Sequence, residues 1–265
     1  AIYLACGLDP EKVVLFKQSD VHEHAELGYI MACSSNMGEL FRMTQYKDKT
    51  AKIGSNESIP TGIFIYPTLM AADIILYDPD FVPVGIDQKQ HVELTRDLAE
   101  RFNHRYSDTF KIPEPVTAKV GAKINSLSNP EKKMSKSESD KGTIYLLEDL
   151  AITRKKIMSA VTDSDNTIVY DMENKPGISN LLTIMSVLSG KSIDELCATY
   201  NGQGYGVFKK AVADVVCDTL KDLQDKVKEI QSSGMIDKVL QEGAEKASYY
   251  ARKKVAKVYR KVGLR

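Results

Sequence analysis

The first half of the chain alternates short apolar runs with amphipathic stretches. Residues 13–19 (VVLFKQS) are rich in β-branched and aromatic side chains and predict a buried strand. Residues 62–78 predict a strand-like start followed by a helix, with Pro67 in the first helical turn. Residues 80–103 predict a short strand that ends at Val84 and then a helix. This repeated alternation of strand and helix favours a mostly parallel α/β sheet.

The second half has a different pattern. From residue 143 onward, nearly every segment repeats its apolar residues at helical spacing, and the segments are bounded by Gly, Ser or Asp. The change falls just after a lysine-rich stretch. We therefore expect an α/β domain over residues 1–140 and an all-helical domain over residues 141–265.

The composition is that of an ordinary globular protein. The 265 residues are 43% hydrophobic and 27% charged, and the formal net charge is zero. A nucleic-acid partner would therefore have to be bound by a local basic patch. The four cysteines are widely separated and form no CxxC pair, which is typical of reduced thiols in a cytoplasmic protein. No apolar run approaches the ~20 residues needed to span a membrane.

Residues 129–142 (NPEKKMSKSESDKG) combine lysines and serines with almost no apolar side chain. Lysines supply point charges for phosphate groups, and serine hydroxyls and loop amides supply hydrogen-bond donors. A solvated basic loop is the alternative interpretation. The order KMSKS over residues 133–137, at the junction of the two halves, is more particular than a lysine run and favours polyphosphate binding.

Two further stretches carry candidate chemistry. Gly85 follows a predicted strand and would let the backbone approach a ligand at the start of the next helix. Asp87 could cap that helix or accept ribose hydroxyls, and Gln88 offers both a donor and an acceptor. Met70 and Asp73 share one face of a predicted helix that is otherwise apolar. Asp73 could face solvent, or it could be a hydrogen-bond acceptor at the floor of an apolar pocket.

Several motifs together resemble the bacterial-type tryptophanyl-tRNA synthetases of class I. KMSKS is similar to the second signature of class I aminoacyl-tRNA synthetases. The motifs VPVGIDQKQHVELTRDLAERFN, YPTLMAADIILYD, ELFRMTQYKDK, SAVTDS and KPGISNLL are similar to segments of this family, in order along residues 1–265. The resemblance implies a Rossmann-like parallel-sheet domain followed by a helical domain. It also implies an ATP-dependent tryptophan–tRNA ligase activity with Mg²⁺, a homodimer, and tRNA(Trp) as partner.

The resemblance also implies a role for each matching residue. Asp73 matches the acceptor of the indole N–H, while Tyr66 and Gln88 match residues that hold the α-amino group of tryptophan. The rest of the indole pocket is expected to be Met70, Val82 and Val84. The expected ATP contacts are Gly85, Ile86, Asp87, Ile124, Lys133, Met134, Ser135, Lys136 and Ser137. The expected catalytic lysines are Lys47, Lys49, Lys133 and Lys136. No metal-ligand set is expected, because His22 and His24 are two apart and do not converge on a helix.

The first signature of the family, a His-x-Gly-His-type turn, has no counterpart among the four histidines of this sequence. We expect that turn and the first sheet strand to precede Ala1. Two alternatives therefore stay open: a tryptophan–tRNA ligase whose sequence is N-terminally incomplete, or a non-catalytic fragment that keeps the fold and the dimer or tRNA surface. A weaker alternative is a related nucleotidyltransferase with another substrate.

Two surfaces are candidates for contact with partners. Residues 28–43 place Met and Tyr on a helix of mostly small residues, which agrees with an interface in the implied homodimer. Residues 249–265 carry seven Lys and Arg and no acid. These cations could complement the dipole at the end of a helix, or they could contact tRNA phosphates.

Overall fold

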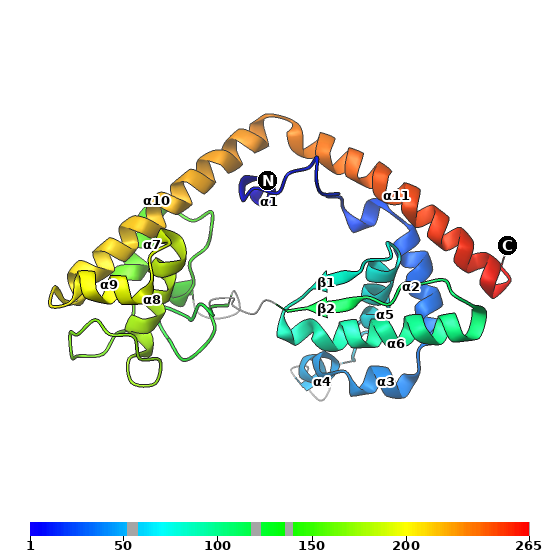
Figure 1. The fold of residues 1–265 in the computed structure, drawn as a ribbon, viewed down its shortest axis with the longest axis horizontal. Helices are drawn as coiled ribbons and strands as arrows, with labels where there is room; N and C mark the ends of the chain where they lie inside the picture. Colours follow the sequence, from blue (N-terminus) through cyan, green and yellow to red (C-terminus); the bar gives the residue numbers. More distant parts are fainter. Residues whose placement is uncertain (52–57, 118–122, 136–139, 265) are drawn as a thin grey trace. The chain divides into compact units, whose positions relative to one another are not determined.

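The computed structural model describes residues 1–51, 58–117, 123–135 and 140–264 (Figure 1). The chain packs into two compact units, and each unit is made of two separate stretches of sequence. The first unit contains Ala1–Leu8 and Val120–Met235, and the second contains Asp9–Lys119 and Ile236–Arg265.

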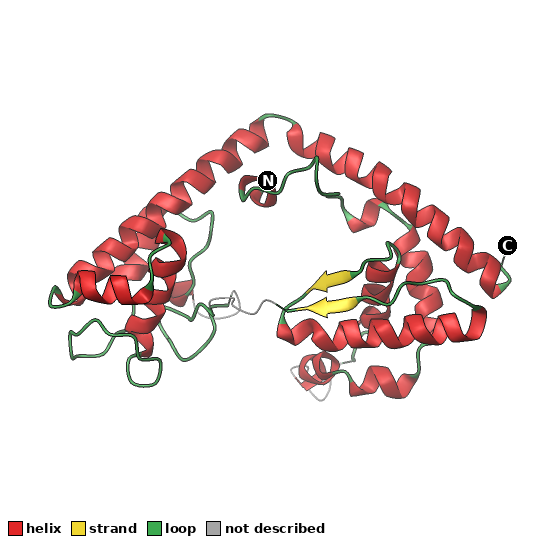
Figure 2. Cartoon of the chain, in the orientation of Figure 1, coloured by secondary structure: helices red, strands yellow, loops and turns green. Residues whose placement is uncertain are grey.

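The second unit combines helices with a small sheet (Figure 2). Its elements are η1 (Gln18–Asp20), α2 (Glu23–Ser34), α3 (Met37–Arg42), α4 (Thr44–Ala51), α5 (Thr61–Ile75), β1 (Phe81–Pro83), η2 (Ile86–Gln88), α6 (Lys89–Tyr106), β2 (Glu114–Val116) and α11 (Met235–Val262). The two strands pair in parallel, with Val82 opposite Pro115, and the backbone N–H of Val84 extends the ladder to the carbonyl of Val116 at 2.9 Å. The strand–helix–strand unit β1–α6–β2 confirms the parallel α/β organisation expected from residues 80–103.

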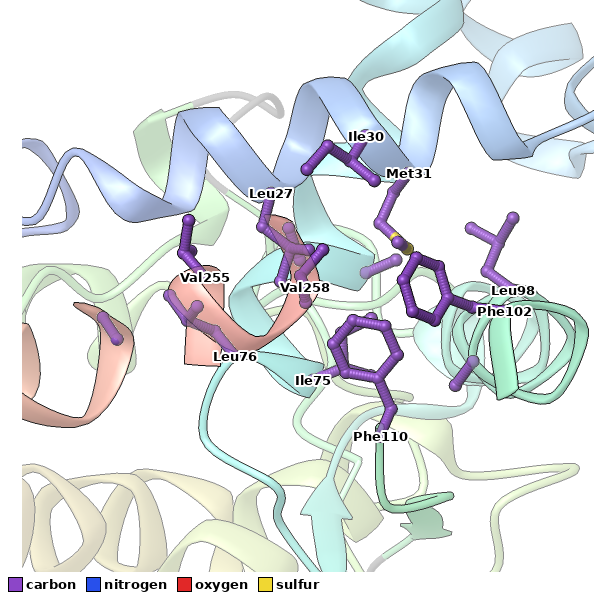
Figure 3. Packing of buried hydrophobic residues seen from close by; sticks show 14 of the residues in the cluster. Leu27, Ile30, Met31, Ile75, Leu76, Leu98, Phe102, Phe110, Val255 and Val258 are labelled. Carbon is purple, nitrogen blue, oxygen red and sulfur yellow. The ribbon is translucent and has the colours of Figure 1, made fainter. Parts of the chain in front are cut away.

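The core of this unit lies between α2, α5, α6 and α11 (Figure 3). Leu94, Leu98 and Phe102 repeat every four residues along α6, and all three are buried. Leu27 of α2 and Val255 of α11 contribute to the same cluster, so the C-terminal part of the sequence completes a core begun near its start. This packing positions α5, which carries three of the six candidate tryptophan contacts.

The strand predicted at residues 13–19 is wrong. These residues form an extended segment that ends in η1, and no described strand lies beside it. Val13 and Val14 are exposed. Because a strand needs a hydrogen-bonded neighbour, β-branched composition alone does not make one here.

The strand-like start predicted for residues 62–78 is also wrong. Helix α5 begins at Thr61, after Pro60 as its N-cap residue, and runs through Pro67. Pro67 removes one helical hydrogen bond, which ordinarily costs about 3 kcal/mol in a helix interior. The side chain of Phe64 packs against the rings of Phe41 and Tyr46, at centroid distances of 4.7 and 5.2 Å. Tertiary packing therefore holds this segment as a helix against its local preference.

The first unit is helical around a separate core. Its elements are α1 (Ile2–Ala5), η3 (Asp140–Gly142), α7 (Leu150–Met158), α8 (Pro176–Ser189), α9 (Ile193–Tyr200) and α10 (Gly204–Ser232). Helix α8 has Pro176 in its first turn and Gly190 in the left-handed region (φ 71°) at its end, so both boundaries follow from local sequence. Leu181 and Phe208, on α8 and α10, are fully buried in this core.

The packing units differ from the domains expected over residues 1–140 and 141–265. Helix α11 packs into the core of the second unit through Ala251 and Val258, whereas α10 belongs to the first unit. The boundary near residue 140 therefore stays a prediction about functional domains. Within the described ranges, no helix is at once long enough and apolar enough to cross a membrane.

Candidate active site

The candidate tryptophan contacts Tyr66, Met70 and Asp73 lie on one face of α5. They are four and three residues apart, so their side chains follow one stripe along the helix. All three are half-buried, while Pro67 and Ala71, the next residues along the helix from Tyr66 and Met70, are buried. The stripe is thus held by a packed helix and is still accessible from outside.

The carboxylate of Asp73 is surrounded by donors from the segment before it in sequence. Gln18 donates from Nε2 to both carboxylate oxygens at 2.7 Å, and His24 donates from Nδ1 to Oδ1 at 2.7 Å. A carboxylate can accept about four hydrogen bonds, so these three contacts leave room for one more donor. Because the Asp73 side chain is 32% exposed, a ligand can supply that donor.

His24 connects Asp73 to the partly buried Tyr77. Its ring is buried, and Nε2 lies 2.8 Å from the hydroxyl of Tyr77. Phe16 packs against both rings at centroid distances of 5.8 and 5.9 Å. Burial raises the pKa of Tyr77 well above its usual range, and the negative charges of Glu23 and Asp73 raise it further. Tyr77 therefore stays protonated and serves His24 as a neutral hydrogen-bond partner.

Two polar side chains, His91 and Lys49, contact Tyr66. Its hydroxyl lies 2.9 Å from Nε2 of His91, in the first turn of α6, and the ammonium of Lys49 lies 4.0 Å from the centroid of its ring. This second contact is a cation–π interaction. Lys47 is exposed two residues earlier on α4, so it points from a different face of that helix.

The turn between β1 and α6 brings the remaining candidates of this unit together. Val82 and Val84 are half-buried, while Ile86 is 84% exposed. Asp87 accepts a hydrogen bond from Nε2 of Gln88 at 2.8 Å. The turn follows Gly85 at the carboxyl end of a parallel strand, which is where α/β sheets bind ligands.

The first unit contains the start of the lysine-rich stretch, and we call its paired residues 124–126 and 132–134 the base of this stretch. Residues 124–126 run antiparallel to residues 132–134, with Asn125 opposite Lys133. The backbone N–H of Met134 donates to the carbonyl of Ile124 at 3.0 Å. Ile124 and Met134 pack against the core, whereas Lys133 is exposed. Lys136 and Ser137 lie outside the residues that the structure describes.

Asn180 of α8 fastens one side of this base. Its Oδ1 accepts from the backbone N–H of Asn125 at 2.8 Å, and its Nδ2 donates to the backbone carbonyl of Asn125 at 2.9 Å. Both asparagines are 2% exposed. The Asn180 side chain thus satisfies the polar backbone groups of a buried residue, as a neighbouring strand would.

Thr143, Lys156 and Glu148 fasten the other side. The hydroxyl of Thr143 donates to the carbonyl of Ser135 at 2.9 Å, and Nζ of Lys156 donates to the carbonyl of Thr143 at 2.8 Å. Lys156 also pairs with Glu148 at 2.6 Å, and both side chains are nearly buried. A buried cation needs such partners, because an isolated charge is strongly disfavoured away from water.

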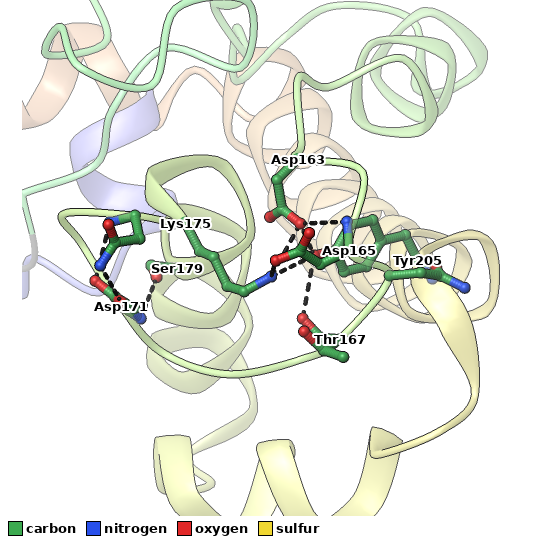
Figure 4. Close-up of polar contacts among 9 residues, drawn as sticks. Asp163, Asp165, Thr167, Asp171, Lys175, Ser179 and Tyr205 are labelled. Carbon is green, nitrogen blue, oxygen red and sulfur yellow. Dashed lines mark hydrogen bonds and ion pairs between the residues drawn. The ribbon is translucent and has the colours of Figure 1, made fainter.

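A polar cluster formed by Asp163, Asp165, Lys175 and Tyr205 supports the same region (Figure 4). Lys175 pairs with Asp163 at 2.9 Å and with Asp165 at 3.1 Å, and the Tyr205 hydroxyl donates to Asp163 at 2.5 Å. Burial opposes ionisation of Asp163, but the hydrogen bonds from Tyr205 and Lys175 outweigh it and lower its pKa. The segment that the cluster holds reaches the loop base, because Val161 donates to the carbonyl of Leu127.

Part of the basic stretch at residues 249–265 has a structural role. The ammonium of Lys254 contacts Asp78 and donates to the carbonyl of Thr109 at 2.9 Å, and its side chain is only 10% exposed. Lys261 donates to the hydroxyl of Ser107. These cations tie α11 to the loops that surround β2, so fewer of them face solvent than the sequence alone indicates.

Sequence reasoning assigned no role in this site to Gln18, His91, Asn180 or Lys156, and it considered His24 only as a metal ligand. The structure places Gln18, His24 and His91 beside expected tryptophan contacts, and Asn180 and Lys156 at the loop base. Gln18, His24, His91 and Asn180 each bond to a partner at least 25 residues away in sequence. Lys156 bonds to Thr143 and Glu148, which are 13 and 8 residues away.

Comparisons with known proteins agree with this arrangement. The family model described as tRNA synthetases class I (W and Y) matches residues 1–221. The chain is 53% identical over 265 residues to the tryptophan–tRNA ligase of Bacillus anthracis, covering 100% of this chain and 80% of that protein.

Two solved structures are similar over nearly the whole chain. Tryptophanyl-tRNA synthetase from Mycoplasma pneumoniae is 41% identical with a TM-score of 0.85, covering 100% of this chain and 80% of that one. The enzyme from Campylobacter jejuni, complexed with ADP and tryptophan, is 37% identical with a TM-score of 0.83, covering 99% of this chain and 81% of that one.

Proposed function

Since the chain belongs to the class I tRNA synthetases of the tryptophan and tyrosine (W and Y) family, we propose how its own residues carry out tryptophan–tRNA ligation. The tryptophan carboxylate attacks the α-phosphorus of ATP, and pyrophosphate leaves with the electron pair of the broken P–O bond. The aminoacyl group then passes to the 3′ ribose of tRNA(Trp), and AMP leaves. No protein nucleophile is required, so catalysis rests on positioning and on neutralising charge that develops on the phosphates.

The observation that carries this proposal is the half-buried Asp73 on the stripe with Tyr66 and Met70. Its carboxylate is fixed by Gln18 and His24 and can accept one more donor. The indole N–H of tryptophan is a neutral donor on an apolar ring, and it fits an acceptor beside apolar side chains. Met70, Val82 and Val84 would line the ring, while Tyr66 and Gln88 would bind the α-amino group.

The proposed nucleotide contacts belong to two motifs of the sequence. Gly85, Ile86 and Asp87 would contact ATP from the turn after β1, with Asp87 near the ribose, and Ile124 would meet the adenine. The phosphates would be held by Lys47, Lys49 and the KMSKS residues Lys133, Met134, Ser135, Lys136 and Ser137. The anchored loop base supports this assignment, because a merely solvated basic loop has no need for the buried partners Asn180 and Lys156.

Mg²⁺ would enter with the ATP phosphates. Across the described ranges, no three His, Cys, Asp or Glu side chains converge as a set of metal ligands. Mg²⁺ ordinarily binds through substrate phosphates, water and one or two carboxylates, so this chain fits a metal carried by the nucleotide. When bound there, Mg²⁺ neutralises negative charge on the phosphates.

Tryptophan-dependent exchange between ATP and labelled pyrophosphate tests this function. We expect exchange with tryptophan and much less with tyrosine. A chain that binds tryptophan without exchange would support the non-catalytic alternative. A chain that exchanges with another amino acid, and not with tryptophan, would contradict the proposal.

Replacing Asp73 with asparagine should weaken tryptophan binding by about 1–3 kcal/mol, the usual cost of disturbing a hydrogen bond to a charged group. Isothermal titration calorimetry measures this directly. Asp80→Asn is a matched control, because Asp80 is an exposed aspartate in the same unit, paired with Lys111. Equal tryptophan affinity in the wild type and Asp73→Asn would remove Asp73 from the site.

We also propose a homodimer, whose interface includes α2 and α3. Tyr29 and Met37 are 73% and 62% exposed there, and exposed apolar side chains of this size are typical of association surfaces. Tyr29→Glu combined with Met37→Glu should shift the protein to monomer at micromolar concentration, as measured by light scattering. Tyr250→Glu, at an exposed tyrosine on α11, should leave the mass unchanged. A wild-type protein that is already monomeric would contradict the dimer.

For the tRNA partner, we propose contact with the exposed cations Arg252, Lys253 and Arg260 of α11. They offer a local basic patch on a chain of zero net charge, and such patches bind phosphate backbones. The cytoplasm is the proposed compartment, since the four cysteines are free thiols of the kind that a reducing environment maintains.

A further inference from the structure

The pair formed by Tyr66 and His91 has a feature that the ligase reaction leaves unexplained. His91 is 1% exposed, and its Nε2 lies 2.9 Å from the Tyr66 hydroxyl. The other ring nitrogen, Nδ1, is buried and has no hydrogen-bond partner within the described part of the chain. Nearly all buried polar groups have partners, so a histidine with a single partner calls for an explanation.

The charged groups around His91 favour its neutral form. Burial lowers the pKa of the imidazole below its ordinary value, and the nearby ammonium of Lys49 on α4 lowers it further. Asp87, on η2, acts in the opposite direction but more weakly. The remaining polar neighbour is Tyr66 on α5, whose own pKa is raised by burial. The pair is therefore neutral at pH 7, with one hydroxyl and one imidazole sharing a hydrogen bond.

The protonation state of His91 determines how many hydrogen bonds the Tyr66 oxygen can accept from a ligand. In the neutral tautomer that carries its proton on Nδ1, Nε2 of His91 accepts from the Tyr66 hydroxyl, and both lone pairs of the tyrosine oxygen are free to accept from an ammonium group. A protonated imidazole can only donate, so it occupies one of those lone pairs. It also places a positive charge beside the positively charged ligand group.

We propose that His91 is a positioning residue: in its neutral form it holds the Tyr66 hydroxyl as an acceptor for the α-ammonium group of the amino acid. Selectivity for ligands that carry this ammonium group then depends on His91, and it is lost in acid. The inference rests on the proposed function, in which Tyr66 binds the α-amino group of tryptophan.

Three indole ligands separate this role from general support of the site. Tryptophan and tryptamine carry the ammonium group, and indole-3-propionate lacks it. With calorimetry at pH 8, we expect His91→Phe to weaken tryptophan and tryptamine roughly 10-fold, the scale of one lost hydrogen bond to a charged group. Binding of indole-3-propionate should change less than about twofold, because phenylalanine fills the same space without an acceptor.

Two further variants complete this comparison. His91→Gln restores a polar group that can accept from Tyr66, and it should recover most of the tryptophan affinity. His104→Phe is the matched control, because it makes the same substitution at an exposed histidine of the same helix. It should leave the affinities for all three ligands unchanged.

The pH profile gives a second readout that a structural role would not change. The ordinary pKa of 6.5 for histidine is lowered in the folded protein, so His91 is neutral above that lowered pKa and becomes charged as the pH falls through it. Wild-type affinity for tryptophan should therefore fall in this acid range relative to indole-3-propionate. In His91→Gln this fall should disappear. His24 beside Asp73 is the same in both proteins, so the difference between their profiles isolates His91.

The outcomes distinguish this inference from the function on which it rests. Equal weakening of all three ligands by His91→Phe, or coincident pH profiles for wild type and His91→Gln, would overturn the role of His91. Tyr66→Phe tests the underlying assignment, since it should lower affinity only for the two ammonium ligands. If Tyr66→Phe does so and the His91 variants do not, only the inference fails. If Tyr66→Phe leaves selectivity unchanged, the assignment of Tyr66 fails. If His91→Phe does not fold, the pH profiles of wild type and His91→Gln decide alone.

Discussion

Lys136→Ala should lower kcat for tryptophan-dependent ATP–pyrophosphate exchange by roughly 10²–10³, the scale of removing one preorganised electrostatic donor. In the proposed mechanism, Lys136 neutralises charge that appears on the pyrophosphate as it leaves. Because this interaction forms mainly in the transition state, KM for tryptophan should change little. Lys136→Arg should restore only part of the rate, since a planar guanidinium does not reproduce a compact ammonium at a phosphate.

Lys141→Ala provides the matched control for this experiment. Lys141 is an exposed lysine that follows the same serine-rich stretch, and it has no assigned contact with the nucleotide. Its removal tests whether the local positive charge alone supports the rate. If both variants lose rate equally, the stretch acts as a general basic surface. A normal kcat in Lys136→Ala would remove this lysine from the reaction.

Asn180→Ala should loosen the base of the lysine-rich stretch and destabilise its packing by roughly 2–6 kcal/mol. The variant leaves the backbone N–H and carbonyl of Asn125 without their partner, and each unsatisfied buried group costs about 1–3 kcal/mol. Hydrogen exchange measured on peptides that cover residues 123–135 should therefore accelerate, since the free energy of local opening falls by this amount. The kcat for exchange should fall as well, while KM for tryptophan should stay near its wild-type value.

Asn174→Ala makes the same substitution at an exposed asparagine that precedes α8, where the side chain contacts only its own turn at Asp171 in the described contacts. We expect no change at residues 123–135 in this control. Unchanged hydrogen exchange in Asn180→Ala would mean that other contacts hold the base. Faster exchange with normal kcat would mean that a fixed base does not matter for the reaction.

The parts of the fold that could be predicted from sequence are those whose signals are local. The four-residue spacing of Leu94, Leu98 and Phe102 gives the buried face of α6, and the turn at Gly85 separates that helix from β1. Residues 13–19 have the composition of a strand, but pairing depends on a neighbour that the segment does not itself encode. Phe64 lies before Pro67 in a helix because of rings on α3 and α4, which no local pattern reveals.

In the candidate site, too, local sequence signals identify some residues, and contacts between distant residues identify the others. Asp73 stands out because it is an acid on an apolar helix face, and KMSKS stands out by its spacing and charge. The partners that fix them are distant: Gln18 is 55 residues from Asp73, and His24 is 49 residues from it. Asn180 is likewise 55 residues from Asn125. A single sequence has no signal for contacts at such separations, so only the structure identifies these residues.

Because helix α11 lies at the end of the sequence, the core of the second unit can be completed only late in translation. Ala247, Ala251, Val255 and Val258 complete a core whose other members all precede residue 111. A ribosome therefore delivers the start of this core first and its closing helix only after residues 120–235 have been synthesised. Until then, the apolar faces of α2 and α5 have no cover from α11. Residues 120–235 follow the start of this core in the sequence, but they contain all members of their own core. That second core can therefore be completed before α11 is synthesised. The nascent chain thus exposes an unfinished hydrophobic surface for a long part of its synthesis, which is when chaperones bind and aggregation begins.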